Sequence, residues 1–314
     1  MPKGLRIVAC IVLAGAYSMV ADWAARHGHQ IILLMTSPAG GPNRYGTGHV
    51  SLVESVPPEQ DVLITTRLRK IAVPVVAALA PDLLISATFP HRIPPELAAI
   101  PRYGALNMHP APLPRGRGPN PQRLIYEGDD TIAGALHRIV PEFDAGPLLS
   151  LQTRQLPDEV TSDDILTSWG ELLVVALEDG VPRAVAGEPG VEQGEALATY
   201  AAPFTEEERW IRWDESSRRV QLRVTALNLT RPMALALLDD EAVSIASVRP
   251  QPGAMPEKAP GTVPHRSGEL ALVCTNDGVV EVTTLGGQGI GKSMVHHDSR
   301  LPTPDSSTSR LEIS

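Results

Sequence analysis

The chain has 314 residues, a length typical of two domains, and 43% of them are apolar, which is enough for ordinary hydrophobic cores. Its formal net charge of −9 argues against a general DNA- or RNA-binding protein, because non-specific affinity for nucleic acids comes from neutralising phosphates. Cys10 and Cys274 lie far apart in apolar runs, so we expect two buried strand thiols, without a disulfide framework or a metal site.

The amino-terminal run IVACIVLAGA follows Lys3 and Arg6 and superficially resembles a secretory signal peptide. We interpret it instead as a buried strand at residues 5–13, followed by a helix at 17–27 and a strand at 30–35. No apolar run in the sequence approaches the roughly 18 residues that span a bilayer. We therefore expect no membrane partner and a cytoplasmic protein.

Short apolar strands and helices alternate along the next hundred residues. After a loose, Gly- and Ser-rich segment at 36–54, the expected elements are a strand at 61–66, a helix at 69–79, a strand at 83–88, a helical turn at 95–100 and strands at 104–108 and 132–140, then a helix at 161–179 that Ser162 caps. This alternation predicts an α/β fold with a doubly wound, mostly parallel, Rossmann-like sheet, in which ligands bind beyond the carboxyl ends of the strands. Only Gly15 follows the first strand where GxGxxG would stand, so a nicotinamide cofactor is not indicated.

The candidate catalytic side chains are concentrated between residues 106 and 146. Asn107 and His109 share one face of an expected strand that three prolines then end, and His137 and Asp144 come from the next strand and turn. The Asn amide can donate to an oxyanion, a His imidazole can carry a proton, and the Asp carboxylate can hold that imidazole charged. These groups suit acyl or formyl transfer to an amine. The sequence has no GxSxG nucleophile elbow, so a covalent acyl-enzyme is not indicated. The alternatives are turn hydrogen bonding and a metal site, which lacks a further ligand.

This stretch resembles the signature of the folate-dependent formyltransferases. The matching residues are Asn107, His109, Pro110, Leu113, Pro114, Arg117, Gly118, His137, Asp144 and Gly146, and the departures are Ala111 and Pro112. The resemblance implies 10-formyltetrahydrofolate as donor, without a metal, and direct attack by an amine. It also implies that Asn107, His109 and Asp144 are catalytic and that His137 supports Asp144 or a water.

The same resemblance implies where the pterin of the folate binds. It would lie mostly on backbone groups of two loops, formed by Phe89, Pro90, His91, Arg92 and Ile93 and by Pro141, Glu142 and Phe143. The first loop departs from the Tyr-Gly pair that is usual in the family, and Pro90 removes one backbone donor.

The second half of the chain reads as a smaller, β-rich unit. Helices are expected at 206–208 and 218–227, and strands at 234–238, 242–248, 269–274 and 279–285, which together suggest a small barrel. The run from Trp213 to Pro232 resembles the OB-like carboxy-terminal domain of methionyl-tRNA formyltransferases. The expected organisation is a catalytic domain at 1–190, a linker at 191–205, an OB-like domain at 206–297 and a disordered tail at 298–314. GGQGIGKS at 286–293 imitates a P-loop, but little chain follows it, so we read a barrel turn.

The identity of the acceptor amine stays open. The resemblance over the whole chain favours initiator methionyl-tRNA, but the segment at 37–51 carries Arg44 as its single Lys or Arg, and the linker continues into three glutamates at 206–208. Acidic residues repel phosphates, so we expect a small-molecule amine such as an amino sugar, an amino acid or a natural-product intermediate. A basic stripe formed by Arg209, Arg212, Arg218, Arg219 and Arg223 would favour tRNA instead. Formimidoyl transfer, hydrolysis of the folate donor and a non-catalytic folate-binding role are the further alternatives.

Overall fold

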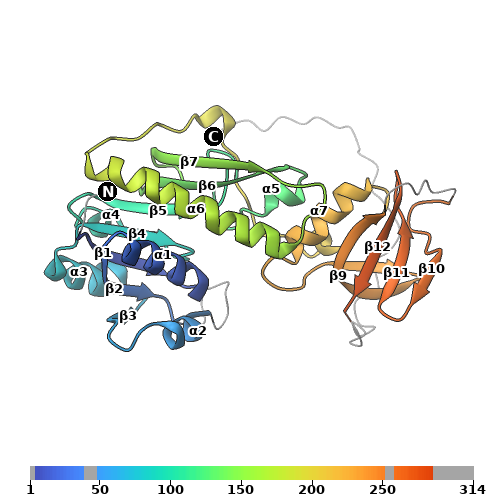
Figure 1. The fold of residues 1–314 in the computed structure, drawn as a ribbon, viewed down its shortest axis with the longest axis horizontal. Coiled ribbons are helices and arrows are strands. Elements are labelled where there is room, and N and C mark those ends of the chain that lie inside the picture. The colour runs from blue at the N-terminus through green and yellow to red at the C-terminus, as the bar shows by residue number, and fades with distance from the viewer. Residues whose placement is uncertain (1–3, 39–47, 252–257, 286–314) are drawn as a thin grey trace, which may run out of the picture.

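The computed structural model describes residues 4–38, 48–251 and 258–285, which form two sheets with helices around the first (Figure 1). The first sheet has seven strands in the order β3-β2-β1-β4-β5-β6-β7. Its strands are β1 (Arg6–Ile11), β2 (Gln30–Thr36), β3 (Val62–Ile64), β4 (Leu83–Ala87), β5 (Ala105–His109), β6 (Thr131–Arg138) and β7 (Leu148–Gln155). Its helices are α1 (Ala14–Arg26), α2 (Gly48–Ser55), the π-helix η1 (Leu68–Ala72), α3 (Val73–Leu79), α4 (Pro95–Ala98), α5 (Arg123–Tyr126) and α6 (Ser162–Val185).

Alternation of apolar side chains along the strands explains why both faces of this sheet are covered. In β1, Ile7, Ala9 and Ile11 pack in a core with α1 and α6, whereas Val8 and Cys10 pack on the opposite face with η1, α3 and α4. A strand that is buried on both faces reads as the continuous apolar run seen in the sequence. The first cysteine is therefore a buried, free strand thiol, as expected, and Cys274 is buried and free as well.

The sheet confirms the predicted α/β class and adds detail at one edge. Strands β3, β2, β1, β4 and β5 run parallel, whereas β6 and β7 run antiparallel to their neighbours. The sequence analysis did not predict β7, because only the first half of this edge strand is buried and its pattern is weak. The chain leaves β1 towards β2 on one side and reaches β4 on the other, so the strand order reverses between β1 and β4. Ligand sites in doubly wound sheets lie near such a reversal, beyond the carboxyl ends of the strands.

Two expectations about helices were wrong. The segment at 36–54 is not loose throughout, because Gly48–Ser55 forms α2. The cap of α6 is Thr161 and not Ser162: Thr161 Oγ1 accepts from the N–H of Asp164, whose carboxylate accepts in turn from the N–H of Thr161. This capping box begins a helix that continues to Val185, six residues beyond its expected end at residue 179.

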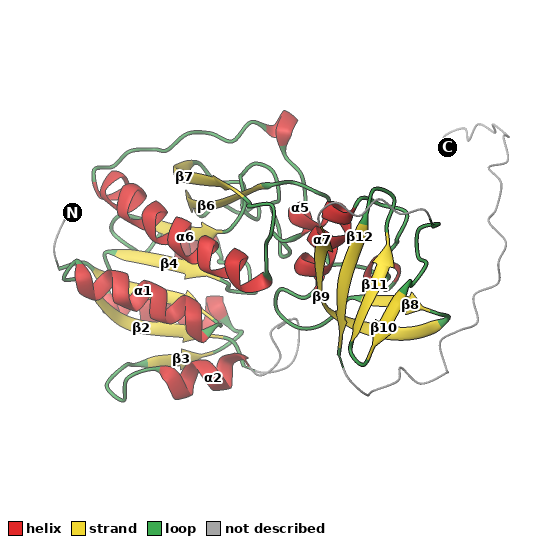
Figure 2. Ribbon diagram, turned by 45° about the vertical axis from the view of Figure 1, so that its right-hand side comes forward, coloured by secondary structure: helices red, strands yellow, loops and turns green. Residues whose placement is uncertain are grey.

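The second unit is a curled, five-stranded antiparallel sheet in the order β10-β11-β12-β9-β8, as the predicted barrel requires (Figure 2). Its elements are the 3-10 helix η3 (Glu207–Arg209), α7 (Ser217–Leu227), β8 (Leu235–Leu238), β9 (Glu241–Gln251), β10 (His265–Ser267), β11 (Leu270–Cys274) and β12 (Val279–Thr284), with β10 additional to the expected strands. A further 3-10 helix, η2 (Glu195–Leu197), lies in the connection. The P-loop-like run and the tail from 298 lie outside the described residues.

One hydrophobic core joins the two units. Ile125 and Tyr126 of α5 and Trp169 of α6 belong to the same buried cluster as Val220 of α7 and Val280 of β12. Tyr126 also donates a hydrogen bond to the carbonyl of Glu208, at 3.0 Å. The second unit is therefore packed against the first. No helix of the described ranges is both long and apolar enough to cross a membrane.

Candidate active site

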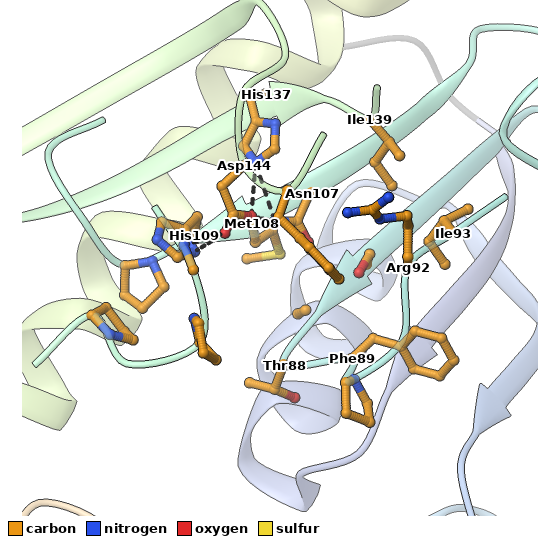
Figure 3. A pocket seen from close by; sticks show the side chains of 18 of the residues that line it. Thr88, Phe89, Arg92, Ile93, Asn107, Met108, His109, His137, Ile139 and Asp144 are labelled. Atoms are coloured by element: carbon orange, nitrogen blue, oxygen red, sulfur yellow. Dashed lines mark hydrogen bonds and ion pairs between the residues drawn. The ribbon is translucent and has the colours of Figure 1, made fainter. Parts of the chain in front are cut away.

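The centre of the candidate site lies on two neighbouring strands. Asn107 of β5 and His137 of β6 are directly opposite in the antiparallel ladder, so their side chains share one face of the sheet. Asn107 Nδ2 lies 3.1 Å from His137 Nε2 and donates to Asp144 Oδ1 at 3.0 Å (Figure 3). His137 Nδ1 donates to the carbonyl of Arg138, which leaves Nε2 facing Asn107 and Asp144. These two contacts fix the orientation of the Asn107 amide, since a reversed amide would face the Asp144 carboxylate with its oxygen.

Asp144 sits in the turn after β6 and faces back towards the strands. Its φ is +54°, in the left-handed region that non-glycine residues rarely adopt, and its Oδ2 accepts from the N–H of Gly118 at 2.8 Å. Burial alone would raise the pKa of Asp144, but the positive charge of His109, the contact with His137 and the Gly118 N–H outweigh it. They hold the pKa of this carboxyl well below its usual range, so Asp144 is ionised at neutral pH.

His109 ends β5 and lies on the other side of Asp144. Its Nε2 is 2.8 Å from the carbonyl of Gly116, and because a carbonyl only accepts, this nitrogen carries a hydrogen. Its Nδ1 lies 3.7 Å from Asp144 Oδ2 and is the nitrogen left to exchange a proton. The predicted residues Asn107, His109, His137 and Asp144 are therefore within reach of one another.

These side chains line a cavity of about 410 Å³. Every residue expected near a pterin also lines it, namely Phe89, Pro90, His91, Arg92, Ile93, Pro141, Glu142 and Phe143. The Arg92 guanidinium lies 4.9 Å from the centre of the Phe143 ring, and His91 Nε2 is 2.9 Å from Ser37 Oγ. Burial lowers the pKa of His91 and favours its neutral form. The cavity is lined mainly by apolar and backbone groups, with the catalytic candidates at one end (Figure 3).

Two glycines of the sequence motif are explained by close approach. A Cβ on Gly146 would lie 1.8 Å from the carbonyl oxygen of Arg138, which is backbone and cannot move aside. A Cβ on Gly118 would lie 2.4 Å from the Tyr200 ring, and the φ of Gly118 is +102°. Both glycines therefore allow the loops that carry and contact Asp144 to pack closely.

Sequence reasoning missed several residues around the site. Thr88, Met108 and Ile139 line the cavity from strand ends, and Tyr200 lines it from the connection between the units. Gln193, also in that connection, donates to the carbonyls of the Asp144 turn. The connection is rich in Gly and Glu, and this composition gave no sign of the contacts from Gln193 and Tyr200. Those contacts depend on how the chain returns to the first sheet.

The arrangement can stabilise an oxyanion and move one proton. The Nδ1–H of a protonated His109 and one N–H of Asn107, turned away from His137 Nε2, can bind developing negative charge on a carbonyl oxygen at one end of the largely apolar cavity. An ionised carboxylate beside them can accept a proton from an attacking amine. Within the described ranges, no group of three or more His, Cys, Asp or Glu side chains is arranged to hold a metal ion.

Comparisons with known proteins cover both units. Residues 21–171 match the family described as formyl transferase, and residues 203–296 match the formyl transferase C-terminal domain. The methionyl-tRNA formyltransferase of Halorhodospira halophila is 30% identical over 215 residues, which are 67% of this chain and 68% of that protein.

Solved structures share the fold. WlaRD, a sugar 3N-formyl transferase, has a TM-score of 0.65 at 10% identity over 91% of this chain and 100% of its own. HypX from Aquifex aeolicus, in complex with tetrahydrofolic acid, has a TM-score of 0.59 at 19% identity over 89% of this chain. This chain spans only 44% of the HypX chain. The chain therefore belongs to the formyl transferase family, the folate-dependent formyltransferases that its motif resembles, and it is a transferase.

Proposed function

We propose that the protein transfers a formyl group from 10-formyltetrahydrofolate to the primary amine of a small molecule. The observation that carries this proposal is the ionised Asp144 carboxylate, held between Asn107, His109 and His137 at one end of a 410 Å³ cavity. A folate would occupy the cavity with its pterin between the 89–93 and 141–143 loops. Beyond His91 and Arg92, a second hollow of about 400 Å³ is lined by Arg67, Arg69 and Lys70, which suits the anionic tail of a folate.

The reaction proceeds by direct transfer between the donor and the amine. The unprotonated amine forms a bond to the formyl carbon, and the carbonyl electron pair moves to oxygen. His109 Nδ1–H and the Asn107 amide stabilise this oxyanion, and Asp144 takes the proton that the amine releases. Collapse of the intermediate re-forms the carbonyl and breaks the bond between carbon and the folate nitrogen, which receives the proton that Asp144 took from the amine. Each such donor typically contributes a few kcal/mol in the transition state.

The preference for a small acceptor comes from the state of the positive charges. Arg209 pairs with Glu206, Arg212 with Asp214, Arg218 with Asp130, and Arg219 and Arg223 with Glu215. The basic stripe that a tRNA-binding enzyme would need is therefore largely neutralised within the chain, with four carboxylates for five arginines. A cation that already has a carboxylate partner releases few counterions when a phosphate approaches, so it contributes little affinity for tRNA.

Methionyl-tRNA is the second candidate acceptor, because a methionyl-tRNA formyltransferase is 30% identical and both family regions are present. The sugar 3N-formyl transferase, in contrast, supports a small acceptor through its fold alone. The two candidates differ in one measurable property. Binding of tRNA depends steeply on salt, and transfer to a small amine does not.

The deciding experiment measures formyl transfer from 10-formyltetrahydrofolate at roughly 50 and roughly 200 mM salt. Initiator methionyl-tRNA, a panel of amino sugars and nucleotide-linked amino sugars, and amino acids serve as acceptors. We expect transfer to a small amine with a weak salt dependence. Efficient, salt-sensitive transfer to tRNA would overturn the proposed acceptor, and formate release without any acceptor would indicate a hydrolase. A 10-formimidoyl donor tested in parallel distinguishes the two one-carbon units.

A further inference from the structure

The connection between the two units returns to the candidate site and contacts both of its loops. Val191 and Leu148 form an isolated antiparallel bridge, with both backbone hydrogen bonds at 2.8 Å, which fixes the chain beside the start of β7. Ten residues later the chain pairs with the loop after β5, where the N–H of Ala201 donates to the carbonyl of Arg117 at 2.7 Å. The intervening segment thus runs beside the turn that carries Asp144 and the loop that contacts it.

Gln193 lies in this segment, and its side chain is 8% exposed. Its Nε2 donates to the carbonyl of Asp144 at 2.8 Å and to the carbonyl of Gly146 at 2.7 Å. Its Oε1 accepts from Nε of Arg117 at 3.0 Å. The buried Gln193 amide therefore donates both of its hydrogens to the turn that carries Asp144. Its oxygen accepts from the loop that contacts Asp144.

The turn needs such support because of its backbone conformation. Asp144 adopts a left-handed φ of +54°, which costs energy for a residue with a side chain and persists only when the surroundings enforce it. The carboxylate reaches His109 and Gly118 from this conformation. A turn that relaxed to an ordinary φ would carry the carboxylate away from both.

Thr199 supports the second loop in the same way. Its Oγ1 accepts from the N–H of Gly116 at 2.9 Å, and its carbonyl accepts from the N–H of Arg117 at 3.0 Å. The carbonyl of Gly116 in turn receives the hydrogen of His109 Nε2. The connection therefore reaches Asp144 through Gln193 and His109 through Thr199 and Gly116.

We propose that Gln193 is a positioning residue that holds Asp144 against His109 and the substrate amine, and that the connection is part of the catalytic apparatus. This role adds a positioning residue to the proposed formyl transfer, and its predicted effect on kcat rests on that proposed function. It assigns no chemical step to Gln193, which stays behind the turn and touches neither donor nor acceptor. The connection was expected to be a linker at 191–205, and a passive linker would tolerate changes at this position.

Three variants of the full chain test the role. Gln193→Met keeps a side chain of similar length and removes all three hydrogen bonds. Gln193→Glu keeps an acceptor for Arg117 but removes both donors to the turn. Glu195→Gln is the matched control, because the exposed Glu195 carboxylate pairs only with the outer nitrogens of Arg117 among the described residues.

Two measurements separate positioning from general stabilisation. Titration of the Asp144 carboxyl by NMR, in protein carrying 13C-labelled aspartate, reports its position without any need for an acceptor. We expect the pKa of Asp144 to rise towards its ordinary range in both Gln193 variants, and kcat for formyl transfer to fall by about 10- to 100-fold with a smaller change in the KM for folate. The control should match the wild type in both. Because the added charge of Gln193→Glu would by itself raise the pKa of Asp144, this variant is judged by kcat, and it decides the question in that way if Gln193→Met does not fold.

The outcomes distinguish the two proposals. An Asp144 that titrates as in the wild type, together with a kcat within about twofold, would overturn the role of Gln193 even if the wild type transfers formyl groups. A wild type that formylates no amine would overturn the proposed function, whereas a raised Asp144 pKa in the Gln193 variants would still support the positioning role.

Discussion

Two regions of the molecule carry clusters of positive charge, and they differ in whether those charges have partners. On the second unit and its contact with the first, Arg123, Arg209, Arg218 and Arg223 all pair with carboxylates at 2.6 to 2.9 Å. At the outer end of the candidate site, only Arg69 of the four cations there pairs with a carboxylate among the described residues. In the first region the ion pairs of Arg123 and Arg218 join the two units, and in the second the positive charge is available to an anion.

The largest effect is expected at the inner end of the candidate site, where we propose that the chemistry takes place. Asp144→Asn keeps the size of the side chain and removes its charge, so the amine loses its proton acceptor and His109 its counter-charge. We expect kcat to fall by at least about 100-fold without unfolding. Because Asp144 stays ionised far below neutrality, its titration should cause no loss of wild-type activity between about pH 5 and pH 8.

Measurement of kcat against pH, with thermal unfolding as a control for structure, checks both statements. Near-normal turnover of the Asn variant would remove Asp144 from the site. His109→Ala should show a loss of similar size, since it removes the ring nitrogen that faces Asp144 Oδ2.

The next largest effect concerns the paired region. Arg223 forms an ion pair with Glu215 at 2.7 Å, donates to the Tyr126 hydroxyl and lies 4.5 Å from the centre of its ring. Arg223→Met removes the closer of the two arginines that pair with the half-buried Glu215 and leaves it the longer contact with Arg219, at 4.0 Å, so we expect a loss of about 2 kcal/mol in the free energy of unfolding. Urea unfolding measures this loss. An equally large fall in kcat with no loss of stability would mean that this region binds substrate.

The unpaired region should show a smaller effect, on folate binding. Arg67→Gln together with Lys70→Gln removes two cations from the 400 Å³ hollow beside His91. We expect the KM for the folate donor to rise by about 5- to 10-fold at low salt, and less at high salt, because the charges are exposed and screened. Arg69→Gln is the matched control, since Arg69 already pairs with Glu96. An equal effect of the control would remove the distinction between paired and unpaired cations.

The smallest effect is expected on stability, at His29, which belongs to neither of the two charged regions. Burial of His29 lowers its pKa, helped by the neighbouring charge of His27, and no described residue forms a hydrogen bond with either ring nitrogen. The unfolded chain, whose histidines titrate near about pH 6.5, then binds more protons than the folded chain. Stability should therefore be fully present above that pH and fall as the pH is lowered towards the folded-state pKa. Urea midpoints at pH 7.5 and 5.5 should differ more in the wild type than in His29→Leu.

Local pattern was enough to predict part of this molecule. The period of two in a strand places Asn107 and His109 on one face, and the prolines after them show where the strand ends. The same reasoning missed α2, whose Gly- and Ser-containing sequence looks like a loop, and β7, whose outer half is exposed. It also left open whether five arginines form a basic stripe, because it could not foresee the carboxylates that the fold supplies, such as Asp130 for Arg218, from 88 residues away. Local pattern determines which side chains share a face, but tertiary contacts determine which of them are satisfied.

The hydrogen bonds from Gln193 and Thr199 have a consequence for how the protein is made. Residues 6–155 contain every strand of the first sheet, yet the segment that fixes its two reactive loops leaves the ribosome about forty residues after β7. The residues of α7 that pack with the apolar residues of α5 leave the ribosome later still. A nascent chain that has completed the sheet therefore has an unfinished site, and we expect no formyl transfer from it until the connection and α7 have emerged.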